Sequence, residues 1–160
     1  MKIAITGHRP EKLGDDHNLL RMNIAKALHK IGATYMYQGM APGADLIAAK
    51  AARNIGLPFM AVVPWMGHVT TITPGWAYDY NKALYYADYV EILSDSETYT
   101  GPWLYHNRNH FMVDHADQVL AIWDGSDKGG TASTVKYAKK KGKPVNILDP
   151  VDMEFYIADY

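Results

Sequence analysis

Hydrophobic and polar positions follow two alternating spacings along the chain. Short apolar runs typical of buried strands occupy residues 2–6, 34–37, 59–63, 89–93, 118–123 and 144–148. Between them, apolar residues recur every three or four positions, which predicts helices over 17–31, 44–55, 76–87, 103–115 and 131–141. Residues 65–75 are rich in glycine and proline and are expected to form a loop.

The order of these elements predicts the fold class. Strands and helices alternate throughout, without a repeat, a low-complexity tract or a linker. We therefore expect one α/β domain over residues 1–160, with a Rossmann-like, doubly wound, mainly parallel sheet in three α/β/α layers. Ligands of such folds bind beyond the carboxyl ends of the strands, where the strand order reverses.

Composition excludes several classes of function. The chain has 16 Lys and Arg against 17 Asp and Glu, so it lacks the basic excess of a strong nucleic-acid binder. It has no cysteine, which excludes disulfides, thiolate metal sites and a cysteine nucleophile. The opening MKIAITGHRP is typical of a strand, and no apolar run reaches the roughly 18 residues of a membrane span. We expect a cytoplasmic protein without a membrane partner.

The turn after the first predicted strand contains candidate ligand-binding residues. Gly7 permits a tight turn there, and His8 and Arg9 follow it. The guanidinium of Arg9 suits a phosphate or a carboxylate. The alternative is an ordinary turn with a solvated Arg9.

A second turn, after the strand at 34–37, contains Gly39 and Gly43. Glycines at a strand-to-helix junction let a ligand approach the backbone, and the first N–H groups of the helix attract an anion. Asp45 lies in the first helical turn, where its alternative role is to cap the helix. We take all three residues as candidates for the ligand site.

A third turn follows the strand at 118–123. Gly129, Gly130 and Thr131 open the next helix, and their backbone predicts a phosphate-binding loop. Asp124 can accept a hydrogen bond from a ribose hydroxyl. The sequence lacks the G-x-x-x-x-G-K-[ST] pattern of a P-loop. The alternative is a polar turn with a helix cap.

The predicted helix at 103–115 supplies further candidates. Asn107, Arg108 and Asn109 can contact a base edge, a ribose or a phosphate, or they can form a solvated helix face. Tyr99 and Trp103 precede them and are candidates for stacking on a base. Most other aromatic side chains of residues 76–105 are expected to pack between copies of the chain, which predicts a homo-oligomer.

Histidines on the same helix do not predict a metal site. His106 and His110 have the spacing of H-E-x-x-H, but Asn107 replaces the glutamate. A zinc site needs a third ligand, and the pattern names none. We expect no metal.

Four motifs together give the chain a family resemblance. TGHRP at 6–10, GMAPGAD at 39–45, YHNRNHFMVDHAD at 105–117 and VLAIWDGSDKGGTASTVKYA at 119–138 resemble the SLOG superfamily of Smf/DprA and LOG proteins. Among its members, the chain is most similar to the small YpsA-type branch of bacteria and phages. The resemblance implies a Rossmann-like fold and a nucleotide-type ligand, with phosphate at Gly129–Thr131 and with Arg108 and Asn109 reaching in from the helix.

Three functions remain open. The first is a sensor or sequestering protein for a nucleotide or a nucleotide-derived molecule, related to NAD or ADP-ribose. The second is a LOG-like enzyme that cleaves or transfers at an N-glycosidic bond, with Asp45 and Asp124 as candidate catalytic carboxylates. LOG enzymes have the motif PGGxGT, followed closely by a catalytic glutamate. The corresponding segment of this chain is DKGGTAST, and Ser133 lies near the position of that glutamate. The third, implied by the DprA resemblance, is a single-stranded nucleic-acid module, which the charge makes the least expected partner.

Overall fold

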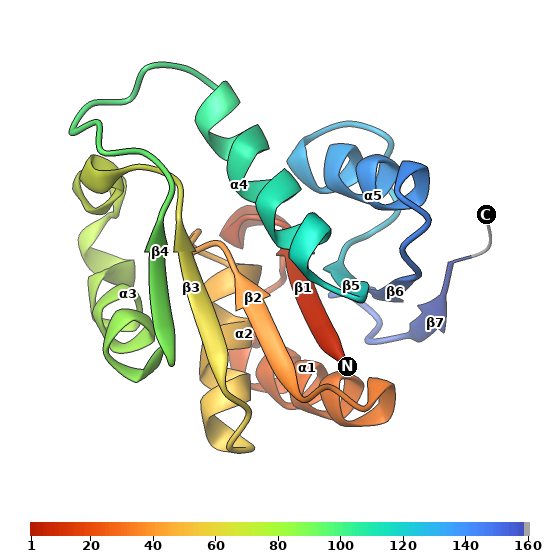
Figure 1. Ribbon diagram of the computed structural model, residues 1–160. Coiled ribbons are helices and arrows are strands. Elements are labelled where there is room, and N and C mark those ends of the chain that lie inside the picture. Colours follow the sequence, from red (N-terminus) through yellow and green to blue (C-terminus); the bar gives the residue numbers. More distant parts are fainter. Residues whose placement is uncertain (159–160) are drawn as a thin grey trace.

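A seven-stranded sheet lies between two layers of helices in the computed structural model, which describes residues 1–158 (Figure 1). The strands are β1 (Lys2–Gly7), β2 (Tyr35–Gln38), β3 (Phe59–Val63), β4 (Tyr89–Ile92), β5 (Gln118–Ile122), β6 (Val145–Leu148) and β7 (Phe155–Ile157). The α-helices are α1 (His17–Ile31), α2 (Ala44–Asn54), α3 (Pro74–Tyr86), α4 (Trp103–His115) and α5 (Gly130–Lys140), with short 3-10 helices η1 (Pro10–Lys12) and η2 (Met66–Thr71). The predicted Rossmann-like α/β fold is confirmed.

The strand order places a ligand crevice between β1 and β5. It runs β4-β3-β2-β1-β5-β6-β7, and the strands β1 to β6 are all parallel to one another. From β1 the chain adds β2, β3 and β4 in turn toward one edge of the sheet. It then returns through α4 to place β5 on the other side of β1, and β6 and β7 follow toward the opposite edge. In such sheets the loops after the two strands at the reversal diverge and leave a crevice.

The helices divide by face. Helices α1, α2 and α3 cover one side of the sheet, and α4 and α5 cover the other (Figure 1). Side chains of β1 alternate between the two cores, because Ile3 and Ile5 pack with the first group and Ala4 with the second. This burial on both faces explains the continuous apolar runs. No helix of residues 1–158 is long and apolar enough to cross a membrane.

The last strand was not predicted from the sequence. β7 is antiparallel to β6 and follows a turn in which the carboxylate of Asp149 accepts from the Val151 N–H and that of Asp152 from the Glu154 N–H. β7 has three residues, none of them fully buried, so it leaves almost no apolar pattern. The segment at 65–75 also differs from a plain loop, because it contains η2 and the start of α3.

Candidate functional site

A cavity of about 380 Å³ lies at the carboxyl end of β1, bounded by the first two turns of α4 and by the start of α5. Nine of the sequence-predicted ligand residues line it: Gly7, His8, Arg9, Asp45, Arg108, Asn109, Gly129, Gly130 and Thr131. They come from four segments that are far apart in the sequence. The fold thus brings the predicted turns together around one cavity, while their role in binding stays a prediction.

The remaining predicted residues lie behind or outside the cavity wall. Gly39 and Gly43 support the wall through their backbones, and Asp124 stands behind His8. Asn107 is exposed and does not line the cavity, although its neighbour Arg108 does. At about 100° per residue, the lining residues Tyr105, His106, Arg108 and Asn109 fall on one side of α4 and Asn107 falls on the opposite side.

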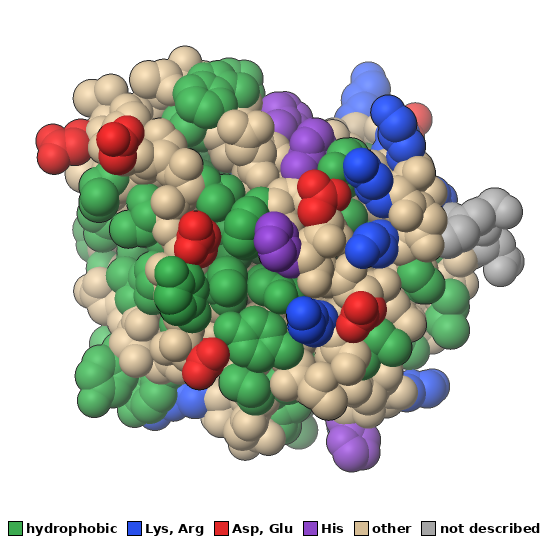
Figure 2. All heavy atoms as spheres, in the orientation of Figure 1, with side chains coloured by type: hydrophobic (Ala, Val, Ile, Leu, Met, Phe, Trp, Pro, Cys, Tyr) green, Lys and Arg blue, Asp and Glu red, His purple; other side chains and the backbone are tan. Residues whose placement is uncertain are grey.

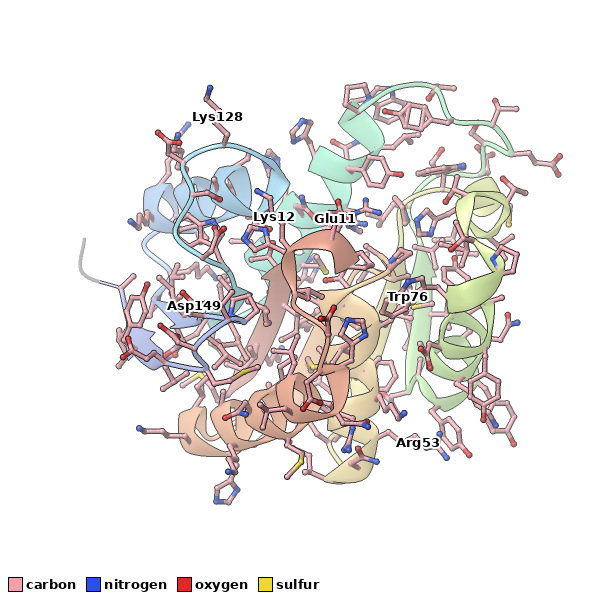
Figure 3. The ribbon with its side chains drawn as sticks, turned by 180° about the vertical axis from the view of Figure 1, so that it is seen from behind. Glu11, Lys12, Arg53, Trp76, Lys128 and Asp149 are labelled. Atoms are coloured by element: carbon pink, nitrogen blue, oxygen red, sulfur yellow. The ribbon has the colours of Figure 1, made fainter. Side chains whose placement is uncertain are left out.

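Nine lining residues were absent from the predicted set, and five of these have charged or aromatic side chains: Glu11, Lys12, Tyr105, His106 and Lys128. Glu11 and Lys12 belong to η1, which begins at Pro10 and turns both side chains toward the cavity. Figure 3 shows these two beside the loop that carries Lys128. Proline at the first position of a short helix was the available signal for η1.

The β1 loop and the start of α2 pack tightly against each other. A Cβ on Gly7 would lie 2.4 Å from the Cβ of Ala44, so close packing as well as turning requires glycine there. Gly43 has φ +98°, and a Cβ on it would lie 2.7 Å from the His8 carbonyl oxygen. That oxygen accepts from the Ala44 N–H at 3.1 Å. These contacts fix the backbone that presents His8 and Arg9.

A strained turn follows β2. Met40 is buried with φ +64°, a left-handed conformation that costs a non-glycine residue free energy. The Gln38 side chain stabilises it by accepting from the Met40 N–H at 2.7 Å. Between them Gly39 leaves room for Arg108, since a Cβ there would lie 2.6 Å from the guanidinium Nε. The turn thereby forms a slot for the Arg108 side chain.

Arg108 places a buried positive charge at the cavity. Only 6 % of the residue is exposed, and its Nη1 donates to the Gly39 carbonyl at 3.0 Å. Nε and Nη2 donate to the Asn109 carboxamide oxygen at 3.1 and 3.0 Å. Burial lowers the pKa of Arg108, but a guanidinium stays charged in proteins. No carboxylate of residues 1–158 lies within ion-pair distance of it, so the charge is available to an anion.

Asp45 is buried nearby and has a structural role in the wall. Its carboxylate accepts from the Ala41 N–H at 3.2 Å, across the turn that precedes α2. Burial raises the pKa of the Asp45 carboxyl, and the charge of Arg108 opposes that rise. No side-chain hydrogen bond caps α2, so Asp45 holds the preceding turn instead of capping the helix. The side chain also lines the cavity, and its role in ligand binding stays a prediction.

The start of α5 presents free backbone N–H groups. The first intrahelical bond joins the Ser133 N–H to the Gly129 carbonyl, and no side chain caps the helix. The N–H groups of Gly130 and Thr131 therefore lack an intrahelical partner, and both residues line the cavity. Gly129 has φ +103°, which glycine adopts readily. A helix start of this kind favours an anion.

His8 and Asp124 pair across the reversal of strand order. His8 Nε2 lies 2.9 Å from Asp124 Oδ1, and Oδ1 also accepts from the Ser126 N–H at 2.9 Å. Hydrogen bonds from Ser126, and then from His8, hold the pKa of Asp124 well below its usual range. The register puts the pair together, because Gly7 lies opposite Ile122 and the His8 N–H donates to the Ile122 carbonyl.

Tyr105 is the aromatic ring that lines the cavity. Its ring centroid lies 5.7 Å from the Arg9 guanidinium carbon and 5.3 Å from that of Arg108. Tyr99 packs behind Tyr105 at 5.9 Å between centroids, and neither Tyr99 nor Trp103 lines the cavity. For stacking on a base, Tyr105 is therefore better placed than the two predicted rings.

Histidines of α4 have separate surroundings. His106 lines the cavity, His110 stacks on Tyr137 at 3.8 Å, and His115 bonds to the Phe111 carbonyl. Within residues 1–158 no three side chains of the metal-ligating types come together.

Exposed aromatic and apolar side chains gather away from the cavity. Tyr78, Tyr85 and Tyr89 are exposed by 70 %, 78 % and 54 %, and β4 is an edge strand. Figure 2 shows hydrophobic side chains on the part of the surface where β2, β3 and β4 lie. Surfaces of this kind favour association, and the predicted homo-oligomer stays a prediction.

Fold and site together define a class: Rossmann-like α/β proteins with a cation-lined pocket at the reversal of strand order. The chain belongs to the YspA SLOG family, whose profile matches residues 3–153. This confirms the family resemblance inferred from the four motifs.

Relatives and solved structures agree with this assignment. A UPF0398 protein of Bacillus cereus (strain G9842) is 28 % identical over 164 residues, covering 90 % of this chain and 85 % of the relative. DNA processing protein A (DprA) of Streptococcus pneumoniae superimposes with a TM-score of 0.66 at 18 % identity, over 92 % of this chain but only 50 % of that one. The molybdenum cofactor carrier protein of Chlamydomonas reinhardtii gives 0.59 at 18 % identity, over 91 % and 74 %. The structures share the fold.

Proposed function

We propose that this protein binds a nucleotide or a nucleotide-derived molecule, such as a relative of NAD or ADP-ribose, as a sensor or sequestering protein. The observation that carries the proposal is the meeting of Arg108 with the open start of α5 at one cavity. A buried guanidinium that has no ion-pair partner in the described part of the chain attracts a phosphate, and so do the N–H groups at a helix start.

Other features of the cavity support a ligand larger than free phosphate. Its volume of about 380 Å³ lies in the range of small-molecule pockets. Tyr105 offers an aromatic face, and Arg9, Lys12 and Lys128 add positive charge around the opening. A ring and an anion site in one cavity suit a molecule with a base and a phosphate.

Structural neighbours support binding rather than one particular ligand. One is described as a carrier of the molybdenum cofactor, and a DprA of Helicobacter pylori, at TM-score 0.64 and 24 % identity, is described by its binding of single-stranded DNA. The first description names a small cofactor and the second a nucleic acid. The near-neutral charge of this chain favours the small molecule over the nucleic acid.

Thermal unfolding with AMP, ADP-ribose and NAD tests the proposal, because a ligand of the folded state raises Tm by mass action. At one hundred times Kd the stabilisation is about 2.7 kcal/mol. Gly130→Asp should abolish the rise, since it places a carboxylate at the proposed phosphate site, where a Cβ meets no atom within 4 Å.

Gly75→Asp is the matched control. Gly75 also lies in the first turn of a helix, with no atom near its Cβ, and it is remote from the cavity. It should leave the ligand-induced rise unchanged. A rise that persists in Gly130→Asp, or the absence of any rise in the wild type, would contradict the proposed function.

A further inference from the structure

The pairing of His8 with Asp124 does more than shape the cavity wall. Oδ1 of Asp124 receives two hydrogen-bond contacts, from the Ser126 N–H and from His8 Nε2, so the carboxylate is fixed in position. Asp124 itself does not line the cavity, whereas His8 does. A carboxylate behind an imidazole that faces a ligand site is the arrangement that orients a proton-accepting histidine.

Two groups contact Nε2 of His8, and they differ in strength. The Asp124 carboxylate is at 2.9 Å and the Asp124 backbone nitrogen at 3.2 Å. The Asp124 N–H is directed at Nε2 and can bond to it only when Nε2 is unprotonated, whereas a proton on Nε2 makes a charge-assisted bond to Oδ1. Because the charge-assisted bond is the stronger of the two, we assign the proton to Nε2, which then donates to Oδ1. In neutral imidazole the other nitrogen, Nδ1, is then the acceptor.

Nδ1 of His8 remains available. It makes no hydrogen bond within residues 1–158. Although only 7 % of His8 is exposed, Nδ1 is not one of the fully buried atoms that lack a hydrogen-bond partner, so it keeps contact with solvent. The exposed part of this buried residue belongs to the cavity lining. Nδ1 can therefore take a proton from a water or a hydroxyl there.

Charge around the cavity decides which reaction this proton transfer suits. The described lining has four Lys and Arg side chains, Arg9, Lys12, Arg108 and Lys128, and only two carboxylates, Glu11 and Asp45. Cleavage of an N-glycosidic bond develops positive charge on the sugar, which cations oppose. Displacement at phosphorus develops negative charge on oxygens, which cations stabilise.

We propose that the pocket hydrolyses a phosphoester or phosphoanhydride bond of its nucleotide-type ligand, with His8 as general base and Asp124 as the residue that positions it. The oxygen of a water attacks phosphorus while His8 Nδ1 takes its proton. The bond from phosphorus to the leaving oxygen breaks, its electron pair stays on that oxygen, and the imidazolium returns the proton to it. The sum is addition of one water. This inference rests on the proposed function.

The experiment follows AMP, ADP, ADP-ribose and NAD by phosphorus NMR and chromatography, with calorimetry for binding. Wild-type protein should cleave at least one probe at phosphorus. His8→Gln should lower kcat by about 10²- to 10⁴-fold. Asp124→Asn should lower kcat with KM unchanged, because its amide no longer fixes the tautomer of His8 and it does not touch the ligand. A merely structural role would not separate kcat from KM.

Asp127→Asn is the matched control. It makes the same change in the same exposed loop, but Asp127 does not bond to His8. It should keep wild-type turnover. Binding without any product would overturn this inference and leave the proposed function standing. Release of free base instead of phosphorus-centred products, or unchanged kcat in His8→Gln and Asp124→Asn, would also overturn it. Absence of binding to every probe would defeat the proposed function and this inference together.

Discussion

Three buried residues near the cavity are each held by a hydrogen-bond partner. Arg108 is fixed by the Gly39 carbonyl and Asn109, and Met40 is held by Gln38. His68, only 1 % exposed, has its Nδ1 3.1 Å from the Tyr80 hydroxyl. Such bonding offsets the cost of burying polar groups. At this scale the proposed site is preorganised, because side chains around the cavity are already held by partners within the fold.

His68 gives the fold a dependence on pH. Burial, with the nearby charges of Arg108 and Arg9, lowers its pKa to about 3 from the usual 6.5. The folded protein therefore keeps His68 neutral, and its contribution to stability is complete above pH 6.5 and is lost as the pH falls from 6.5 toward 3. Between these pH values His68 is protonated in the unfolded chain but not in the folded one. The free energy of unfolding therefore falls by about 1.4 kcal/mol for each unit by which the pH decreases.

His68→Gln should remove this part of the pH dependence while keeping a polar group beside Tyr80. Urea unfolding at about pH 7.5 and about pH 5 measures it, and the wild type should lose about 2 kcal/mol more between the two than the variant does. Equal losses in both proteins would show that His68 is not held neutral.

At the scale of elements, the contact between β1 and α2 sets the shape of the pocket. The chain leaves β1 at Gly7, against the first residue of α2, and η1 then turns back toward the cavity. The sequence predicted the strand and the helix, since each has a clear periodicity. It did not predict their contact or the role of Glu11 and Lys12, because both depend on segments far apart in the sequence meeting in space.

Gly7→Ala should destabilise the fold by about 1–3 kcal/mol through overpacking against Ala44. Ala44→Gly should cost up to about 1 kcal/mol by itself, because glycine is a poorer helix former. Since the two methyl groups collide with each other, the double variant should be more stable than the sum of the single changes predicts. Denaturant unfolding of all four proteins measures the coupling, and strict additivity would exclude this contact.

For the whole molecule, the sequence predicted the fold class and the convergence of the loops, because alternating elements dictate a parallel sheet and parallel strands end at one edge. β7 escaped prediction because its three residues are not fully buried. The sequence did not show which side of α4 faces the cavity, and so it did not separate Asn107 from Arg108. It also did not show that Tyr105 rather than Tyr99 lines the cavity, because both placements depend on packing between elements. Site residues within a sequence motif were thus easier to predict than site residues that reach the cavity through tertiary packing.

Overall charge leads to a prediction about nucleic-acid binding. The net charge is -1, and the cations of the cavity lie in one small area. The protein should therefore bind a fluorescent oligothymidine only non-specifically, with a Kd of about 10⁻⁴ to 10⁻⁶ M at physiological salt. Fluorescence anisotropy at low and physiological salt measures this. Nanomolar affinity at physiological salt would contradict the small-molecule account and favour the single-stranded nucleic-acid function.

The most direct test of the ligand pocket is a crystal structure of the protein grown with AMP. The account predicts that the phosphate lies within hydrogen-bond distance of the Gly130 and Thr131 backbone nitrogens, on the cavity that Arg108 lines. AMP bound anywhere else, with that cavity empty, would contradict it.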